Sequence, residues 1–130
     1  MSNDSIGAML TTLRNGALRR AQSVVVVKTK LNEAILKILK ETGFVFEITE
    51  EKKGSRLALR VHVLNEHHQP AFRIIKRLSK PGLRRYAKAS QIPNPLGGYG
   101  LLIISTPKGV MSGVAARTKG LGGELLCEVS

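Results

Sequence analysis

The sequence has few of the residues that staple, anchor or export a protein. Its 130 residues include one cysteine, Cys127, so no intrachain disulfide can form, which is typical of a reducing compartment. The longest apolar runs, at residues 23–27 and 101–104, are far shorter than the ~20 residues that span a bilayer. The N-terminus carries Asp4 where a secretory signal would have basic and then apolar residues. We therefore expect neither secretion nor insertion into a membrane.

Groups that carry catalysis or bind metal are also scarce. Asp4 is the only Asp, and the three His residues with Cys127 match no metal-ligand spacing, so we interpret the histidines as surface residues. Residues 105–108 fit the S-x-x-K pattern of penicillin-interacting enzymes, but the partner motifs S-D-N and K-T-G do not occur. We predict no enzymatic activity, no metal and no cofactor, and we keep a small hydrolase as the weakest alternative.

The sequence also lacks a phosphate-binding glycine loop. Glycines cluster at residues 97–100 and 120–123, but neither segment contains G-x-x-x-x-G-K-[ST] or a G-x-G-x-x-G between a strand and a helix. Glycine permits tight turns and close approach of two backbones, and we prefer this interpretation of both clusters to direct phosphate contact. We expect no small-molecule substrate.

Positive charge is what the sequence has in excess. It holds 21 Lys and Arg against nine Asp and Glu, a formal net charge of +12. Ten basic and two acidic residues follow residue 70, so most of the excess lies in the second half. These cations cannot all be neutralised internally, and the release of counterions from a phosphate backbone rewards such an excess. We therefore predict binding to nucleic acid, in preference to a membrane surface or a merely solvated basic face.

Helical and strand patterns alternate in the first half. Apolar residues spaced by three and four predict two helices, with Asp4 or Ser5 as the first N-cap and Gly43 beyond the end of the second helix. A β-branched run and two alternating segments predict strands, the last two joined by a hairpin connection at residues 50–55. The expected order is helix, strand, helix, strand, strand, at residues 4–16, 24–28, 31–42, 44–48 and 57–63.

The second half reads as mainly β. The polar segment 65–70 ends in Pro70, so we place a boundary there, between an N-terminal lobe of residues 1–66 and a C-terminal lobe of residues 67–130. We expect strands at residues 72–78, 83–87, 101–105 and 125–129, a short helix at 112–119, a turn at 79–82, and loops at 92–98 and 105–109. The fold class is thus α+β or α/β in two small lobes, the second mainly β with one short helix.

Two segments of the second lobe could contact RNA. The hydroxyls of loop 105–109 suit the minor groove of RNA and Lys108 suits a phosphate, although an ST-turn that caps the next helix explains the same residues equally well. Tyr86, beside Arg84 and Arg85, suits stacking on a base with basic neighbours on phosphates, or packing at a sheet edge.

Three ordered motifs resemble those of a known family. Residues 105–111, STPKGVM, and 120–127, GLGGELLC, are similar to the C-terminal signature of the bacterial-type small-subunit ribosomal protein eight family. Residues 79–86, SKPGLRRY, resemble its central S-[RK]-P-G-L-R-x-Y segment, and residues 4–16 resemble its first helix. The resemblance covers essentially the whole chain.

The resemblance implies a ribosomal role. It implies a primary RNA-binding protein that contacts a helical element in the central domain of small-subunit ribosomal RNA and helps its assembly. Neighbouring small-subunit proteins would be further partners, and the location would be the cytoplasmic ribosome or an organellar one. The alternative is a charge-driven RNA chaperone or translational regulator without specific recognition of ribosomal RNA.

The family motifs imply particular RNA-binding residues in the second lobe. Ser105 and Thr106 would approach the RNA minor groove. Glu124 is unfavourable in charge beside phosphates, so it would accept a hydrogen bond from a base or order the loop hydroxyls. The other implied RNA-binding residues are Lys80, Arg84, Arg85, Tyr86, Lys108, Gly122 and Gly123. Three residues would support the surface: Pro107, Gly109 and Cys127.

The chain departs from the family pattern in two places. Pro107 stands where a second Ser is usual, which removes a hydroxyl and a backbone donor and predicts the loss of one RNA hydrogen bond. Residues 111–117 lack the charged residues usual early in the helix, so the helix dipole loses its acidic partner. Gly113 weakens a helix by about 1 kcal/mol relative to Ala. We expect a looser helix, or a different neighbour contact, at this position.

Overall fold

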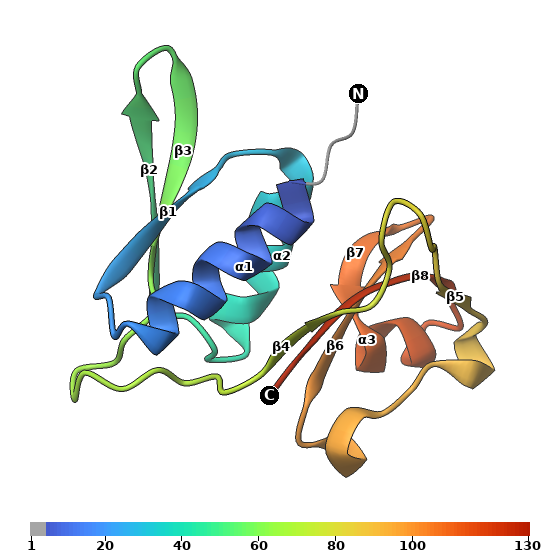
Figure 1. Cartoon of the computed structure of the whole chain (residues 1–130). Helices are drawn as coiled ribbons and strands as arrows, with labels where there is room; N and C mark the ends of the chain where they lie inside the picture. Colours follow the sequence, from blue (N-terminus) through green and yellow to red (C-terminus); the bar gives the residue numbers. More distant parts are fainter. Residues whose placement is uncertain (1–4) are drawn as a thin grey trace. The chain divides into compact units, whose positions relative to one another are not determined.

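The computed structural model describes residues 5–130, apart from the side chains of residues 96 and 97. These residues form two compact units, 5–73 and 74–130, each with its own sheet and helices (Figure 1). This arrangement confirms the predicted α+β class with a mainly β second part. The units divide later than the predicted boundary at residue 66, because Leu64 pairs with Pro70 and Phe72 is buried at 3% exposure within the first unit.

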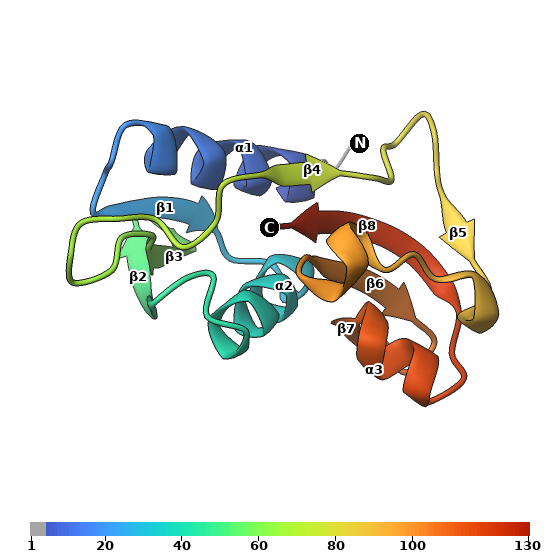
Figure 2. The same ribbon diagram turned by 90° about the horizontal axis from the view of Figure 1, so that it is seen from below.

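The first unit is a three-stranded antiparallel sheet with two helices on one face. Its elements are α1 (Ser5–Leu18), β1 (Ser23–Val27), α2 (Lys30–Glu41), β2 (Glu47–Lys53) and β3 (Arg56–His62). The strand order is β1-β3-β2, and Figure 2 shows α1 running along β1. Alternate residues of β1, Val24 and Val26, are buried toward the helices, as the two-residue period of a strand requires. Asp4, one of the two expected caps of α1, lies outside the described residues.

Helix α1 is longer than predicted because Gly16 serves packing. A Cβ atom at Gly16 would lie 2.4 Å from Cγ1 of Val24, so the glycine allows the helix to press against β1 instead of ending it. The helix continues to Leu18. The prediction for α2 is confirmed, with Thr29 as N-cap accepting a hydrogen bond from the backbone N–H of Asn32 at 3.0 Å.

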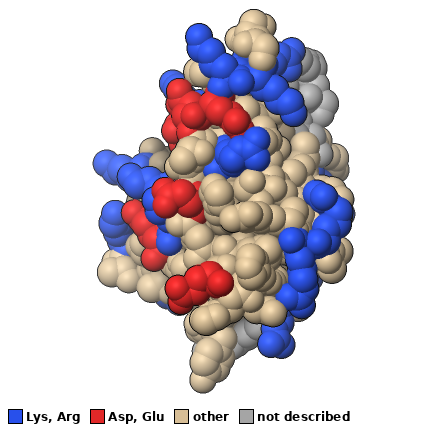
Figure 3. All heavy atoms as spheres, turned by 90° about the vertical axis from the view of Figure 1, so that its left-hand side faces the viewer, with Lys and Arg blue, Asp and Glu red and all other residues tan. Residues whose placement is uncertain are grey.

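Strand β2 lies further along the chain than predicted. Lys53 pairs with Arg56, so the expected connection at residues 50–55 contracts to a two-residue turn. The strand tolerates its acidic residues because they meet cations: Glu51 pairs with Arg60 at 2.9 Å, and other pairs are Lys40–Glu47 and Lys28–Glu50. Figure 3 shows acidic and basic side chains interleaved on one face of the molecule.

The predicted alternation of buried and exposed residues is reversed at residues 44–46, just before β2. Val45 is buried at 1% exposure, whereas Phe44 and Phe46 are half-buried. The reason is local: the N–H groups of Phe44 and Val45 both donate to the carbonyl of Leu39 and close the end of α2. Within β2 the predicted phase returns, because Ile48 is half-buried between the exposed residues Glu47 and Thr49.

The second unit is a sheet built around its last strand. Its elements are β4 (Ile75–Arg77), β5 (Tyr86–Ala87), η1 (Ala89–Gln91), η2 (Pro95–Gly98), β6 (Leu101–Thr106), β7 (Gly109–Ser112), α3 (Gly113–Thr118) and β8 (Gly123–Val129). The strand order is β4-β8-β6-β7, and β5 also pairs with β8. The core beneath α3 is formed by Leu78, Ile92, Leu102, Ile104, Ala116 and Leu125.

Several predictions for the second unit need correction. The strands expected at 72–78 and 83–87 are only three and two residues long, and 3₁₀ turns occupy parts of 89–98. The loop expected at 105–109 is a hairpin: Thr106 pairs with Gly109, and the unpredicted strand β7 follows. The polar residues of this hairpin concealed its strand character.

Helix α3 begins where predicted, and packing explains its glycine. A Cβ atom at Gly113 would lie 2.9 Å from Cδ2 of Leu102 and 3.1 Å from Cγ2 of Ile92. The hydroxyl of Ser112 accepts a hydrogen bond from the N–H of Ala115 at 3.1 Å and caps the helix. Close contact with the core therefore accounts for Gly113, which the sequence alone suggested would loosen the helix.

Candidate RNA-binding surface

Strand β8 brings the three candidate motifs of the second unit together. Glu124 of β8 pairs with Tyr86 of β5 along one edge and with Ser105 of β6 along the other. Residues 79–86, 105–111 and 120–127 therefore meet at one end of the sheet, although they are far apart in the sequence. Register in an antiparallel sheet fixes such neighbours within about 5.5 Å between Cα atoms.

Two glycines make this convergence possible. A Cβ atom at Gly123 would lie 2.0 Å from the carbonyl oxygen of Ser105, and one at Gly122 would lie 2.5 Å from that of Ala87. Any larger residue would push the neighbouring backbones away from β8. The close-approach interpretation of these glycines agrees with this geometry, and both are also partly exposed at the surface.

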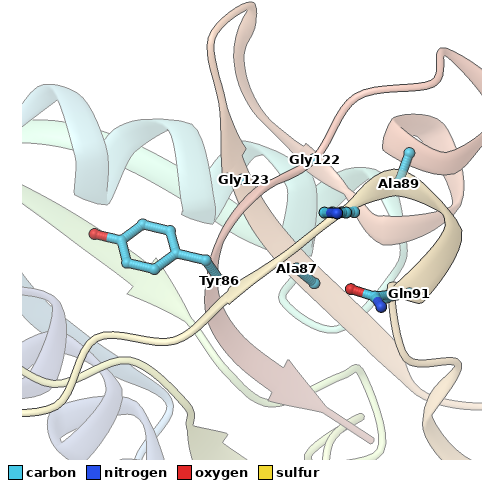
Figure 4. Close-up of a pocket in the computed structure, with 7 residues that line it drawn as sticks. Tyr86, Ala87, Ala89, Gln91, Gly122 and Gly123 are labelled. Atoms are coloured by element: carbon cyan, nitrogen blue, oxygen red, sulfur yellow. The ribbon is translucent and has the colours of Figure 1, made fainter.

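A shallow hollow lies beside this glycine pair. It has a volume of about 550 Å³ and is lined by Tyr86, Ala87, Lys88, Ala89, Gln91, Gly122 and Gly123. Figure 4 shows the Tyr86 ring extending away from Ala89 and Gln91, and 70% of this residue is exposed. The ring is thus free to stack on another ring. Sequence reasoning missed Ala89 and Gln91, which carry no charge or motif that could have marked them.

The turn between β6 and β7 is closed by the hydroxyl of one of its own residues, Thr106. Oγ1 of Thr106 donates to the carbonyl of Gly109 at 2.8 Å and accepts from the N–H of Lys108 at 3.1 Å. Thr106 is 8% exposed and its hydroxyl serves the turn, while the groove contact that the family motif implied for it stays a prediction. Pro107 occupies a turn position that makes no ladder bond, and Lys108 is exposed beside it. Ser105 is half-buried, and its hydroxyl bonds to no described residue.

The carboxylate of Glu124 is directed to the protein's own loop. Oε2 of Glu124 accepts from the Ser79 hydroxyl at 2.6 Å and from Nη1 of Arg84 at 3.0 Å. The Ser79 hydroxyl in turn accepts from the N–H of Arg85 at 2.9 Å. Of the two expected roles for Glu124, the ordering of hydroxyls is therefore seen, but with Ser79 in place of Ser105 and Thr106. Sequence reasoning placed Ser79 in a turn and in the central family motif, but it assigned no role to this hydroxyl.

Cys127 lies inside the sheet. It is fully buried, and burial, with a smaller contribution from Glu128, raises the pKa of its thiol to about 12. The thiol therefore stays protonated at neutral pH and packs as a small apolar group. Within residues 5–130, no group of three or more His, Cys, Asp or Glu residues is placed to hold a metal ion.

The surface of the second unit is positive. Its two acidic residues, Glu124 and Glu128, are half-buried, and Glu124 is already bonded to Arg84. The exposed basic residues of this unit are Lys76, Lys80, Arg84, Arg85, Lys88, Lys108, Arg117 and Lys119. In the part of the chain that the structure describes, no helix is long and apolar enough to cross a membrane.

An exposed tyrosine among exposed arginines, at the end of a sheet with a positive surface, defines a small basic protein of the nucleic-acid-binding class. Comparison with known proteins names its family. The family model described as Ribosomal protein S8 matches residues 4–130, and the chain belongs to this family.

Curated relatives agree over nearly the full length. The chain is 44% identical to small ribosomal subunit protein uS8c of Gracilaria tenuistipitata var. liui, with 99% of each chain covered. It is 44% identical to small ribosomal subunit protein uS8 of Prochlorococcus marinus (strain MIT 9313), and 43% identical to that of Nostoc punctiforme, with 98% of each chain covered. The family resemblance is confirmed, and the family gives this chain a structural role in the ribosome and no enzymatic one.

Proposed function

We propose that this chain is a primary binder of small-subunit ribosomal RNA, that it contacts a helical element of the RNA's central domain, and that it helps this RNA to fold during assembly. Family membership supports the ribosomal setting. The single observation that carries direct RNA contact is the double pairing of Glu124 with Tyr86 and Ser105, which gathers three motifs into one surface.

The surface suits irregular RNA better than a regular duplex. Tyr86 offers an exposed ring for an unstacked base, and such stacking is worth about 1–3 kcal/mol per base. Arg85 and Lys108 stand exposed on the two loops beside it, where they can contact phosphates. The free hydroxyl of Ser105 can bond to a base edge or a 2′-hydroxyl. A stacking ring, cations for phosphates and a hydrogen-bonding hydroxyl thus occur together on one surface.

The test is the affinity of the full chain for the cognate small-subunit RNA hairpin and for an unrelated duplex of equal length, over a salt series. We expect the cognate RNA to bind at least ~10³-fold more tightly at physiological salt. Equal affinities, both falling steeply with salt, would replace this proposal with charge-driven RNA binding.

Tyr86→Ala and Tyr99→Ala are a matched pair for this test. Tyr99 is also exposed in the second unit, at 89%, but it precedes Leu101, which pairs with Val129 at the opposite end of the sheet from Glu124. We expect Tyr86→Ala to weaken cognate binding about tenfold or more, and Tyr99→Ala to change it less than about twofold. Equal effects of the two changes would place recognition elsewhere.

A further inference from the structure

The loop between β4 and β5 is closed at its base by β8. The N–H of Leu78 donates to the carbonyl of Leu126 at 3.0 Å, and the N–H of Leu125 donates to the carbonyl of Arg85 at 2.9 Å. Neighbouring residues of β8 therefore hold both ends of the segment 79–84, which leaves the sheet edge between them. This segment is the yellow excursion before β5 in Figure 2.

A tight turn forms the tip of this loop. Lys80 and Leu83 exchange two backbone hydrogen bonds of 3.0 Å around Pro81 and Gly82. The tip presents its side chains to solvent: Leu83 is 65% exposed, and Lys80 is exposed beside it. An apolar residue so exposed on a positive loop gains nothing from the protein's own packing.

Ser79 joins the two sides of the loop base. Its hydroxyl donates to Glu124 of β8 and accepts from the N–H of Arg85, which lies six positions further along the chain. Ser79 is only 5% exposed, so water competes little for these bonds. A hydrogen bond to a charged carboxylate is also stronger than one between neutral groups. The contact couples the tip of the loop to the strand that carries the recognition surface.

We propose that Ser79 and Glu124 form a latch that holds residues 79–86 in the RNA-binding conformation, so that Glu124 acts as a positioning residue through Ser79 and does not touch the RNA. The proposal rests on the proposed function. A carboxylate near phosphates repels them, and removing it would by charge alone strengthen RNA binding. The latch gives the opposite expectation, because a loosened loop must be ordered again when RNA binds.

Four variants of the full chain test the latch by a double-mutant cycle: Ser79→Ala, Glu124→Ala, their combination, and Glu124→Gln. We expect each alanine change to weaken binding to the cognate hairpin about tenfold, because a bond to a charged group is lost. The double variant should bind within about twofold of the weaker single variant, because both changes break one unit. Glu124→Gln keeps an acceptor for Ser79 and should lose less than about threefold. Losses that multiply, or tighter binding by Glu124→Ala, would overturn the latch.

Ser112→Ala is the matched control. Ser112 also accepts a backbone N–H in the second unit, but it caps α3 and lies outside the loop. We expect this variant to keep cognate affinity within about twofold. If it loses as much as Ser79→Ala, general destabilisation explains both results and the latch is wrong.

Amide exchange without RNA separates the latch from the proposed function. The N–H of Arg85 bonds to the Ser79 hydroxyl, so its exchange should accelerate in Ser79→Ala while that of Leu102 in the core stays slow. Unchanged exchange at Arg85 overturns the latch even if the wild-type chain prefers its cognate RNA. If exchange at Arg85 accelerates but the wild-type chain does not prefer its cognate RNA, the proposed function is overturned. The latch then holds the loop but has no role in RNA binding.

Discussion

The two units of this protein handle charge in opposite ways. In the first unit, acidic residues of β2 pair with cations of neighbouring elements: Glu51 with Arg60 of β3, and Glu47 with Lys40 of α2. The second unit holds nine basic residues and two acidic ones, and one of these two, Glu124, is bonded to Ser79 and Arg84 of its own loop. The first unit offsets part of its positive charge with acidic partners, whereas almost none of the charge of the second unit is offset.

Two packing glycines, Gly16 of the first unit and Gly123 of the second, differ in what lies closest to them. In the first unit, Gly16 faces a methyl group of Val24. In the second, Gly123 faces the carbonyl oxygen and carbon of Ser105, which belong to the backbone. A side chain can shift by changing rotamer, but a paired strand can shift only by breaking its ladder. The contact between Gly123 and Ser105 is therefore less tolerant of a larger residue than the contact between Gly16 and Val24.

The largest effect that we predict follows from this contrast. Gly123→Ala should destabilise the second unit by about 3 kcal/mol or more, because the new methyl group would overlap the Ser105 backbone. Urea unfolding followed by circular dichroism measures the loss. Gly82→Ala is the control, since no atom lies within 4 Å of a Cβ there, and it should change stability by less than about 0.5 kcal/mol. Equal stability of the two variants would contradict the close approach of β8 and β6.

The same contact shows why sequence reasoning reached only part of the site. Helix α2 and strand β6 were predictable because their periodicity and apolar runs are local properties. The glycines were predictable as close-approach residues, but not their neighbours. Ser79 and Glu124 are 45 positions apart, and only the register of β8 brings them together. No local pattern could have indicated that contact.

Polar strands were the other weakness of the sequence reading. Strand β7 and the second half of β2 carry too few apolar residues to stand out, and their strand character comes from pairing with β6 and β3. The boundary was placed too early because Asn65–Pro70 looks like a linker, although Asn65 organises a turn by accepting from the N–H groups of His67 and Gln69. Tertiary pairing decided each of these cases.

An intermediate effect concerns the one buried ionisable group of the second unit that has a raised pKa. The ordinary pKa of a cysteine thiol is 9.0, and burial raises that of Cys127 to about 12. The contribution of this group to stability is therefore complete below pH 9.0 and declines as the pH rises toward about 12, because the unfolded chain ionises first. At pH 10 the loss should be about 1 kcal/mol relative to Cys127→Ala, measured by urea unfolding across pH. Parallel pH profiles of the two proteins would show that the thiol is not buried.

The smallest effect tests the charge contrast between the units directly. Lys108→Gln removes an exposed cation of the second unit, and Lys40→Gln removes a cation that faces Glu47 at 3.7 Å in the first. If Lys108 contacts a phosphate, its loss should weaken cognate and unrelated RNA alike by a few-fold, and should reduce the slope of log affinity against log salt by about 1. Lys40→Gln should leave that slope unchanged.

The two slopes decide between the specific and the general meaning of the charge. A neutralised pair contributes little to the field around a protein, so the Lys40–Glu47 pair should be nearly silent in RNA binding. A reduced slope in Lys40→Gln would mean that RNA reads the total charge of the chain and not one unit. A reduced slope in Lys108→Gln alone would assign phosphate contact to the hairpin of β6 and β7. This hairpin adjoins the end of the sheet where β8 pairs Glu124 with Tyr86 and Ser105.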